Sequence, residues 1–379
     1  MRLARRVVVV VAVSAVGAGV SVAPQALAAA VESYVVVFQD TVGNPQAVAN
    51  EHSRRHGADL AHTYSHALKG YSARIPSNRV DSIRSDPRVA YVEADRVMKA
   101  NAQSIPWGIS KVGATVSSTL AGNGSGAVGN VNVYVIDTGV YAHPDLNLVR
   151  HVNYAGGKNT DCHGHGTHVA GTIAAKDNSS YVVGAVPGAP LTGVKVLGCN
   201  GSGWTSNIIK GIDWVTTNAQ KPAVANMSLG GGVSQALDTA VVGSAASGVL
   251  YALAAGNAGA NACNSSPARA GAGTDNGIVT VAATDSSDKE ASWSNYGSCV
   301  DIWAPGVSIL STRKGGGTTT MSGTSMASPH VAGGGALYLS SHTADAPSTV
   351  EAALKLGAQA PGSLSKDGRS ILREYVGLL

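Results

Sequence analysis

The chain has 379 residues, of which 44% are hydrophobic and only 13% are charged. This composition excludes a disordered, charge-solvated chain and fits one large globular domain or about two ordinary ones. The formal net charge of +4 comes from the N-terminal part, because residues 102–379 hold equal numbers of acidic and basic side chains. Without a basic surface, a nucleic-acid partner is not expected.

Residues 1–28 have the pattern of a secretory signal peptide. Three arginines at positions 2, 5 and 6 precede an apolar run over 7–22, and the sequence Ala-Leu-Ala follows at 26–28, with small residues at its first and last positions. The run is shorter than the roughly 18–20 residues of a spanning helix, although a membrane anchor is the alternative. We therefore predict a secreted, extracellular product that has no contact with the membrane after cleavage.

The cysteines agree with export. Cys162, Cys199, Cys263 and Cys299 form an even set, and disulfides form and persist outside the cell. A zinc site is the alternative, but no pair has the Cys-x-x-Cys spacing typical of such sites. Two disulfides are predicted, and the residues alone leave three pairings open.

Residues 29–101 have the pattern of a small α+β domain. Strands are predicted at 34–38 and 70–75, with an edge strand at 89–92. Helices are predicted at 46–57 and 78–85, the first with His52 on its exposed face. This domain contains no cysteine and no candidate nucleophile, so the chemistry is expected elsewhere.

Residues 102–379 have the pattern of an α/β domain. Apolar runs alternate with helical stretches, which predicts a parallel sheet covered by helices on both faces. Ligands bind such sheets at the carboxyl ends of the strands, and Asp137, Asn257 and the glycines after Ser228 each follow an apolar run. The predicted strands are 131–136, 191–196, 223–227, 250–254 and 278–281.

Three short segments carry residue types suited to nucleophilic catalysis. Asp137 ends a strand, the segment 163–171 places histidine at the start of a small-residue helix, and Ser325 stands at a helix N-terminus. A serine hydroxyl needs a base, and that base needs an orienting acceptor. The helix N-terminus favours negative charge on a reacting oxygen, and the amide of Asn257 is a candidate second donor.

Other interpretations of these residues remain open. Asp137 and Ser325 could simply cap a turn and a helix, and His163, His165 and His168 could bind zinc in a metallohydrolase. An α/β-hydrolase esterase is disfavoured because its residues run Ser, Asp, His along the chain. The last alternative is a non-catalytic binding protein with the same fold. Nothing in the sequence favours it, because none of the candidate catalytic positions is substituted.

These segments, in the order Asp, His, Ser, resemble the subtilisin-like serine peptidases, and most of all their proteinase K and aqualysin branch. Residues 29–101 resemble the inhibitor propeptide of that family. The resemblance implies a three-layer α/β peptidase domain preceded by a ferredoxin-like α+β propeptide. It also implies that Asp137, His168 and Ser325 form the catalytic triad, with Asn257 and the Ser325 backbone N–H as oxyanion hole.

The resemblance also implies further site residues. It pairs Cys162 with Cys199 and Cys263 with Cys299. It implies substrates that are proteins and peptides, bound as an added strand and cut after large apolar or aromatic residues. The implied substrate-binding residues are Leu229, Gly230, Gly231, Ala254, Ala255 and Gly256.

Maturation and metal binding complete the expectations. The propeptide is expected to inhibit its own enzyme, with self-cleavage within 98–103, to release a monomer. No catalytic cofactor is expected, but Asp301 is a candidate ligand of a structural Ca²⁺ with backbone carbonyls near Asn276 and Ile278. The segment 270–276 is longer than the family pattern, so a plain capping role for Asp301 is the alternative.

Overall fold

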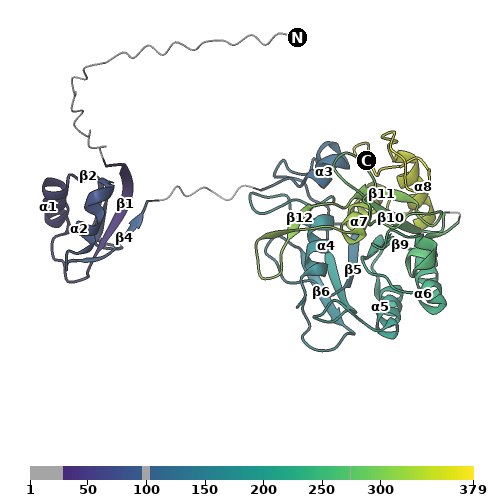
Figure 1. Ribbon diagram of the computed structural model, residues 1–379. Coiled ribbons are helices and arrows are strands. Elements are labelled where there is room, and N and C mark those ends of the chain that lie inside the picture. Colours follow the sequence, from purple (N-terminus) through teal and green to yellow (C-terminus); the bar gives the residue numbers. More distant parts are fainter. Residues whose placement is uncertain (1–28, 96–102, 274) are drawn as a thin grey trace, which may run out of the picture. The chain divides into compact units, whose positions relative to one another are not determined.

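The computed structural model describes residues 29–95, 103–273 and 275–379 (Figure 1). The predicted signal peptide therefore lies outside the described residues. The chain divides into two compact units between Lys99 and Ala100, and each is considered by itself. Within the described ranges, no helix is long and apolar enough to cross a membrane.

The N-terminal unit is a four-stranded antiparallel sheet packed against two helices, which confirms the predicted small α+β domain. Its core comes from alternate residues of the strands and from one face of each helix, with Val36, Tyr71 and Ile83 fully buried. In sheet order, the strands are β2 (Asp59–Tyr64), β3 (Gly70–Pro76), β1 (Val31–Phe38) and β4 (Val89–Ala94), and the helices are α1 (Pro45–His56) and α2 (Val80–Arg84).

Two features of this unit differ from the predictions. Strand β2 was not predicted, because it is a largely exposed edge strand without an apolar run. His52 is buried instead of exposed, since its ring nitrogens lie 2.9 Å from the Tyr71 hydroxyl and 3.1 Å from Asp86 Oδ2. A polar side chain with two partners can be buried without a large penalty.

The C-terminal unit is built on a parallel sheet of seven strands within the described residues. The two edge strands of this sheet were not predicted. The strand Leu148–Asn153 contains polar residues, and the strand Ile302–Pro305 ends in proline, so each has a weak sequence pattern. In sheet order, the strands are β11 (Ile302–Pro305), β10 (Ile278–Thr284), β9 (Val249–Ala254), β8 (Ala223–Met227), β5 (Asn132–Asp137), β7 (Leu191–Lys195) and β6 (Leu148–Asn153).

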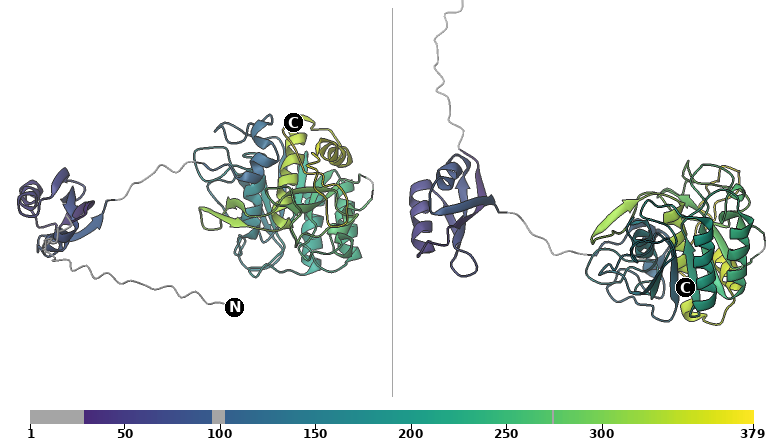
Figure 2. Two further views of the ribbon diagram at one scale, coloured as in Figure 1. Left: turned by 45° about the horizontal axis from the view of Figure 1, so that its top comes forward. Right: turned by 90° about the horizontal axis from the view of Figure 1, so that it is seen from below.

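Helices cover both faces of this sheet, which confirms the three-layer fold (Figures 1 and 2). Alternate residues of β5 face opposite layers: Val133 and Val135 pack with the α4 and α7 layer, and Tyr134 and Ile136 with the α5 and α6 layer. The covering helices are α4 (His165–Ala174) and α7 (Thr324–Ser341) on one face, and α5 (Thr205–Asn218) and α6 (Gln235–Ala246) on the other.

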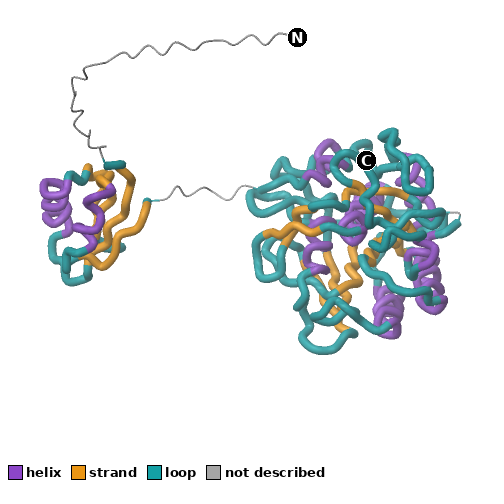
Figure 3. The backbone as a smooth tube through the Cα atoms, in the orientation of Figure 1, coloured by secondary structure: helices purple, strands orange, loops and turns teal. Residues whose placement is uncertain are grey.

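Loops form much of the surface of this unit (Figure 3), as expected from 47 glycines in the chain. The remaining elements of the unit are helices α3 (Trp107–Lys111) and α8 (Pro347–Gly357), hairpin strands β12 (Ile309–Thr312) and β13 (Thr318–Met321), and 3₁₀ turns at Ala114–Val116, Ala262–Asn264 and Ala268–Gly271. A further 3₁₀ turn, Ser77–Arg79, lies in the N-terminal unit.

The candidate residues lie where three neighbouring central strands have their carboxyl ends. Strands β5, β8 and β9 are adjacent and parallel. Their carboxyl ends therefore bring together Asp137, the Ser228 segment and the Asn257 segment, as the rule for ligand sites in parallel sheets requires.

Candidate active site

Asp137 and His165 form the first pair of the site. Asp137 is the last residue of β5 and is fully buried, and His165 is the first residue of α4. The His165 Nδ1 lies 2.8 Å from Asp137 Oδ1, which also accepts from the Thr138 backbone N–H at 2.6 Å. Because a carboxylate only accepts, Nδ1 carries the proton and the opposite nitrogen, Nε2, keeps its lone pair.

His168 does not have the position that the sequence analysis assigned to it. Its Nε2 lies 2.9 Å from the carbonyl oxygen of Ile309, and the residue is completely buried. A carbonyl can only accept, so this nitrogen holds its proton and is turned toward β12. The interpretation of His168 as the partner of Asp137 is wrong, because His165 has that place.

Buried Asp161 fixes the segment that carries His165, and the sequence analysis missed it. Its Oδ1 accepts from the backbone N–H groups of His163 and Gly164 at 2.9 and 2.8 Å. Its Oδ2 accepts from Thr167, from the N–H at 3.0 Å and from the hydroxyl at 2.5 Å. The sequence does contain a signal for this role, because Asp161 is an acidic residue shortly before a predicted helix. A carboxylate there accepts from the backbone N–H groups of the first turn, which have no partner within the helix.

Ser325 lies in the first turn of α7, as predicted. Four residues later, Pro329 lacks the N–H that would bond to the Ser325 carbonyl within the helix. The hydroxyl of Ser228 donates to that carbonyl instead, at 2.8 Å, and the Ser325 hydroxyl donates to the Ser228 carbonyl at 3.2 Å. These reciprocal bonds join the start of α7 to the end of β8.

A buried polar network supports this junction. The side-chain amide of Asn226 donates to the Ser228 hydroxyl at 2.9 Å, and its carbonyl oxygen accepts from the Ser328 hydroxyl at 2.8 Å. These three side chains are buried and each makes a hydrogen bond within the network, so they restrict α7 to one position on the sheet.

Asn257 and Ser325 line the same pocket. Its Oδ1 accepts from the backbone N–H and hydroxyl of Thr324, at 2.8 and 2.9 Å. A Cβ placed on Gly323 would lie 3.5 Å from Asn257 Nδ2 and 3.6 Å from the Ser325 nitrogen. Both donors therefore border one point in space, which glycine at 323 leaves open.

A pocket of about 320 Å³ opens beside Ser325. Ala254, Ala255 and Gly256 form part of its wall, together with Leu229, Gly230 and Gly231. The structure thus gathers around one cavity all six residues predicted to bind substrate. A second pocket of about 550 Å³ is lined by His163, His165, Ser228 and Ser325, and it shares Leu229 and Gly230 with the first.

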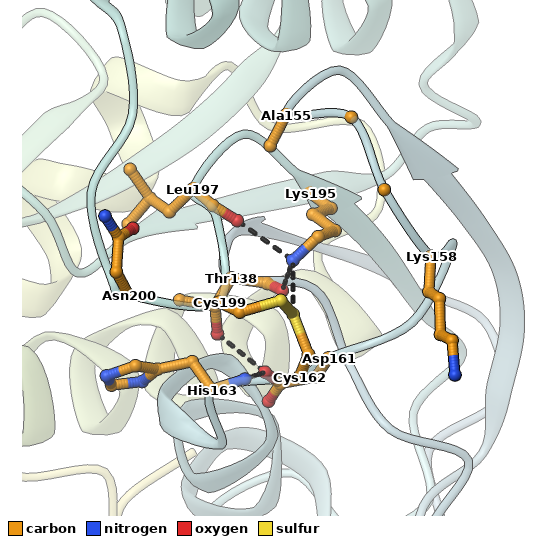
Figure 4. The surroundings of a disulfide bond; sticks show 12 residues. Thr138, Ala155, Lys158, Asp161, Cys162, His163, Lys195, Leu197, Cys199 and Asn200 are labelled. Carbon is orange, nitrogen blue, oxygen red and sulfur yellow. Dashed lines mark hydrogen bonds between the residues drawn. A yellow bond between two sulfur atoms is a disulfide. The ribbon is translucent and has the colours of Figure 1, made fainter.

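The first predicted disulfide holds the histidine segment (Figure 4). Cys162 is bonded to Cys199, and Cys263 to Cys299, which confirms the predicted pairing. Beside the first bridge, the buried ammonium of Lys195 donates to the carbonyls of Thr138 and Leu197, at 2.7 and 3.0 Å, and to Cys162 Sγ at 3.5 Å. Burial lowers the pKa of Lys195.

The zinc alternative requires three imidazole nitrogens that converge on one point. His165 Nδ1 is bonded to Asp137 and His168 Nε2 to a backbone carbonyl, and His163 is exposed at the rim of the larger pocket. Among the described residues, no group of three or more His, Cys, Asp or Glu side chains could hold a metal ion.

The Asp301 region does not fit the expected calcium site. Asp301 Oδ2 accepts from the Thr280 backbone N–H at 2.8 Å, and the ammonium of Lys355 lies 3.8 Å from Oδ1. Burial, the largest cause, raises the pKa of Asp301 to about 7. A lysine ammonium therefore lies beside the carboxylate that was the candidate calcium ligand.

Comparisons with known families and proteins agree with this geometry. Residues 129–371 match the model of the subtilase family, and residues 33–101 match that of the peptidase inhibitor I9 family. A solved structure of a cold-adapted subtilisin-like serine proteinase superposes with a TM-score of 0.61 at 41% identity, covering 72% of this chain and 98% of the other.

Curated relatives extend the match. The chain is 45% identical over 312 residues to an extracellular serine proteinase of Thermus sp. (strain Rt41A), which covers 79% of this chain and 73% of the relative. It is 42% identical over 360 residues to alkaline serine exoprotease A of Vibrio alginolyticus, covering 87% of this chain. The match spans only 64% of the length of the Vibrio protein.

The two histidines should titrate differently. Burial lowers the pKa of His165, but the Asp137 carboxylate outweighs burial and raises it overall; burial lowers the pKa of His168 to about 4. NMR titration should show His165 protonating above pH 6.5 on acidification and His168 staying neutral down to about pH 4. Asp137→Asn should lower the pKa of His165; a shift confined to His168 would contradict the pairing.

Proposed function

Because the chain belongs to the subtilase family, we propose that it is a secreted serine endopeptidase in which Asp137, His165 and Ser325 form the triad. The observation that carries the proposal is the 2.8 Å contact between Asp137 Oδ1 and His165 Nδ1. This contact fixes the tautomer whose Nε2 can accept a proton, and His165 and Ser325 line one pocket.

The proposed reaction uses these three side chains, and it requires the Ser325 hydroxyl to turn from the Ser228 carbonyl to His165 Nε2. His165 Nε2 takes the proton of the Ser325 hydroxyl as its oxygen attacks the carbonyl carbon of the substrate. Asp137 stabilises the imidazolium that forms, and His165 then donates the proton to the leaving amine. Water repeats the sequence on the acyl enzyme, which releases the acid product and restores Ser325.

Asn257 and the start of α7 stabilise the oxyanion. Asn257 Nδ2 and the Ser325 backbone N–H border the point left open by Gly323. Donors fixed in this way before the reaction need no reorganisation when negative charge develops. The helix dipole of α7 adds to this effect because Ser325 lies in its first turn.

Substrate recognition is proposed to rest on backbone pairing and one apolar pocket. Both backbone polar groups of Gly231 bond to Ser266, at 2.9 and 3.3 Å, so pairing with an extended substrate falls to Leu229 and Gly230. The pocket walled by Ala254 and Ala255 holds about 320 Å³. Its volume and small side chains favour cleavage after large apolar or aromatic residues.

Secretion and inhibition by the N-terminal unit complete the proposal. Two disulfides favour an extracellular location, and the Thermus relative is named as extracellular. The match of residues 33–101 to the inhibitor family supports a role as inhibitory propeptide. Its tail would occupy the substrate groove as an extended strand and be cleaved there.

Replacing either histidine by glutamine separates the two candidate bases. His165→Gln should lower kcat by about 10⁶-fold, the size of effect known for the triad histidine of this family. His168→Gln retains an amide donor for the Ile309 carbonyl and should keep kcat within about tenfold. The assay is peptide hydrolysis per folded molecule, normalised by circular dichroism. Loss of catalysis in His168→Gln alone would refute the assignment.

The oxyanion role of Asn257 predicts a kinetic signature. Asn257→Ala should lower kcat by about 10²–10³-fold, as found for such a donor in this family, with KM nearly unchanged. The amide acts on charge that exists only in the transition state, so substrate binding should not change. Steady-state kinetics on a peptide substrate measures both constants, and an effect confined to KM would mean that Asn257 only shapes the pocket.

Self-processing predicts two different secreted products in a host without extracellular proteases. Ser325→Ala should accumulate with residues 29–101 attached, whereas the wild type and Ser341→Ala, a control in the same helix, should yield a shorter chain. The segment 98–102 lies outside the described residues. Gln103 already bonds to the carbonyls of Lys176 and Val182, so N-terminal sequencing should place the cut before it. Normal processing of Ser325→Ala would exclude self-cleavage.

A further inference from the structure

We propose that the ammonium group of Lys355 is the built-in cation of the site where the family resemblance implies calcium, and that this site binds no Ca²⁺ in the native enzyme. The inference concerns stability and is separate from the proposed peptidase reaction. It rests on the contacts of Lys355 and on the direction in which the adjoining backbone presents its polar groups.

Lys355 lies among three carboxylates. Its Nζ contacts Asp275, lies 3.1 Å from Glu351 Oε1 and lies 3.8 Å from Asp301 Oδ1. Glu351 precedes it by one turn of α8, and its side chain is fully buried. An ammonium has three donors and no acceptor, so it is suited to bridge oxygens that arrive from separate segments.

The backbone beside this cluster presents donors to Glu351. Glu351 Oε2 accepts from the N–H groups of Asn276 and Gly277, both at 2.8 Å, and of Ile278 at 3.3 Å. Calcium requires six to eight oxygen ligands, often including backbone carbonyls. Three N–H groups therefore already satisfy Glu351 Oε2, and of the expected backbone ligands the Ile278 carbonyl lies on the Asp301 side.

Two cations cannot share the space. The acceptor Asp301 Oδ2 is also engaged by the Thr280 N–H, and the side chain of Asp301 is only 8% exposed. A Ca²⁺ ion among these carboxylates would lie beside the partly buried ammonium, where water screens their repulsion weakly. Asp275, three residues before the start of β10 and far from Lys355 in the chain, completes the set of carboxylates around the ammonium.

Crystals of the wild-type mature enzyme grown in millimolar CaCl₂ test the site directly. The enzyme is first treated with a phosphonofluoridate to stop self-digestion; if it has no peptidase activity, the treatment is unnecessary and the test still applies. Anomalous scattering should show no peak among Asp275, Glu351 and Asp301, and Lys355 Nζ should occupy that space. A calcium peak there overturns the proposal, whereas peaks elsewhere do not concern this site.

Thermal unfolding of variants tests the structural role of the ammonium. Lys355→Met should lower Tm by roughly 4–10 °C, because three carboxylates lose their cation. Lys210→Met, a control at an exposed lysine paired with Asp213, should change Tm by less than about 2 °C. Equal Tm values for the two variants would overturn the proposal; if Lys355→Met cannot be produced, the anomalous peak alone decides.

Discussion

The reciprocal hydrogen bonds between Ser228 and Ser325 are the constraint on which the rest of the site depends. They fasten the first turn of α7 to the end of β8, where Pro329 has left a helical carbonyl without its usual donor. Because β5, β8 and β9 are neighbours, this single junction places the serine between the carboxylate end of β5 and the Asn257 loop. The geometry of the proposed active site thus follows from the order of the strands.

Much of this arrangement could be predicted from sequence because its signals are local. A carboxylate at the end of an apolar strand, Asp137, and a serine at the start of a small-residue helix, Ser325, both have the expected positions. The family resemblance also gave the correct disulfide pairs. The resemblance and the alternation of strands and helices together were enough to predict the three-layer fold.

The spacing of the two histidines along α4 explains why the assignment of His168 was wrong. His165 begins α4, and His168 lies about 4.5 Å farther along the helix axis. At that depth it is surrounded by buried neighbours and bonded to β12, so it reaches neither Asp137 nor the pocket. The other misses have two causes. The edge strands β2 and β6 contain polar residues and β11 has only four residues, so their local patterns are weak. The contact of Lys355 with Asp301 joins segments far apart in the chain.

The structure of the phosphonylated enzyme would test the central claim most directly, because the adduct resembles the tetrahedral intermediate. The account predicts a covalent bond to Ser325 Oγ, with the phosphoryl oxygen accepting from Asn257 Nδ2 and the Ser325 N–H, and with His165 as the imidazole beside the adduct. Attachment to another residue, or a phosphoryl oxygen turned away from Asn257, would contradict it.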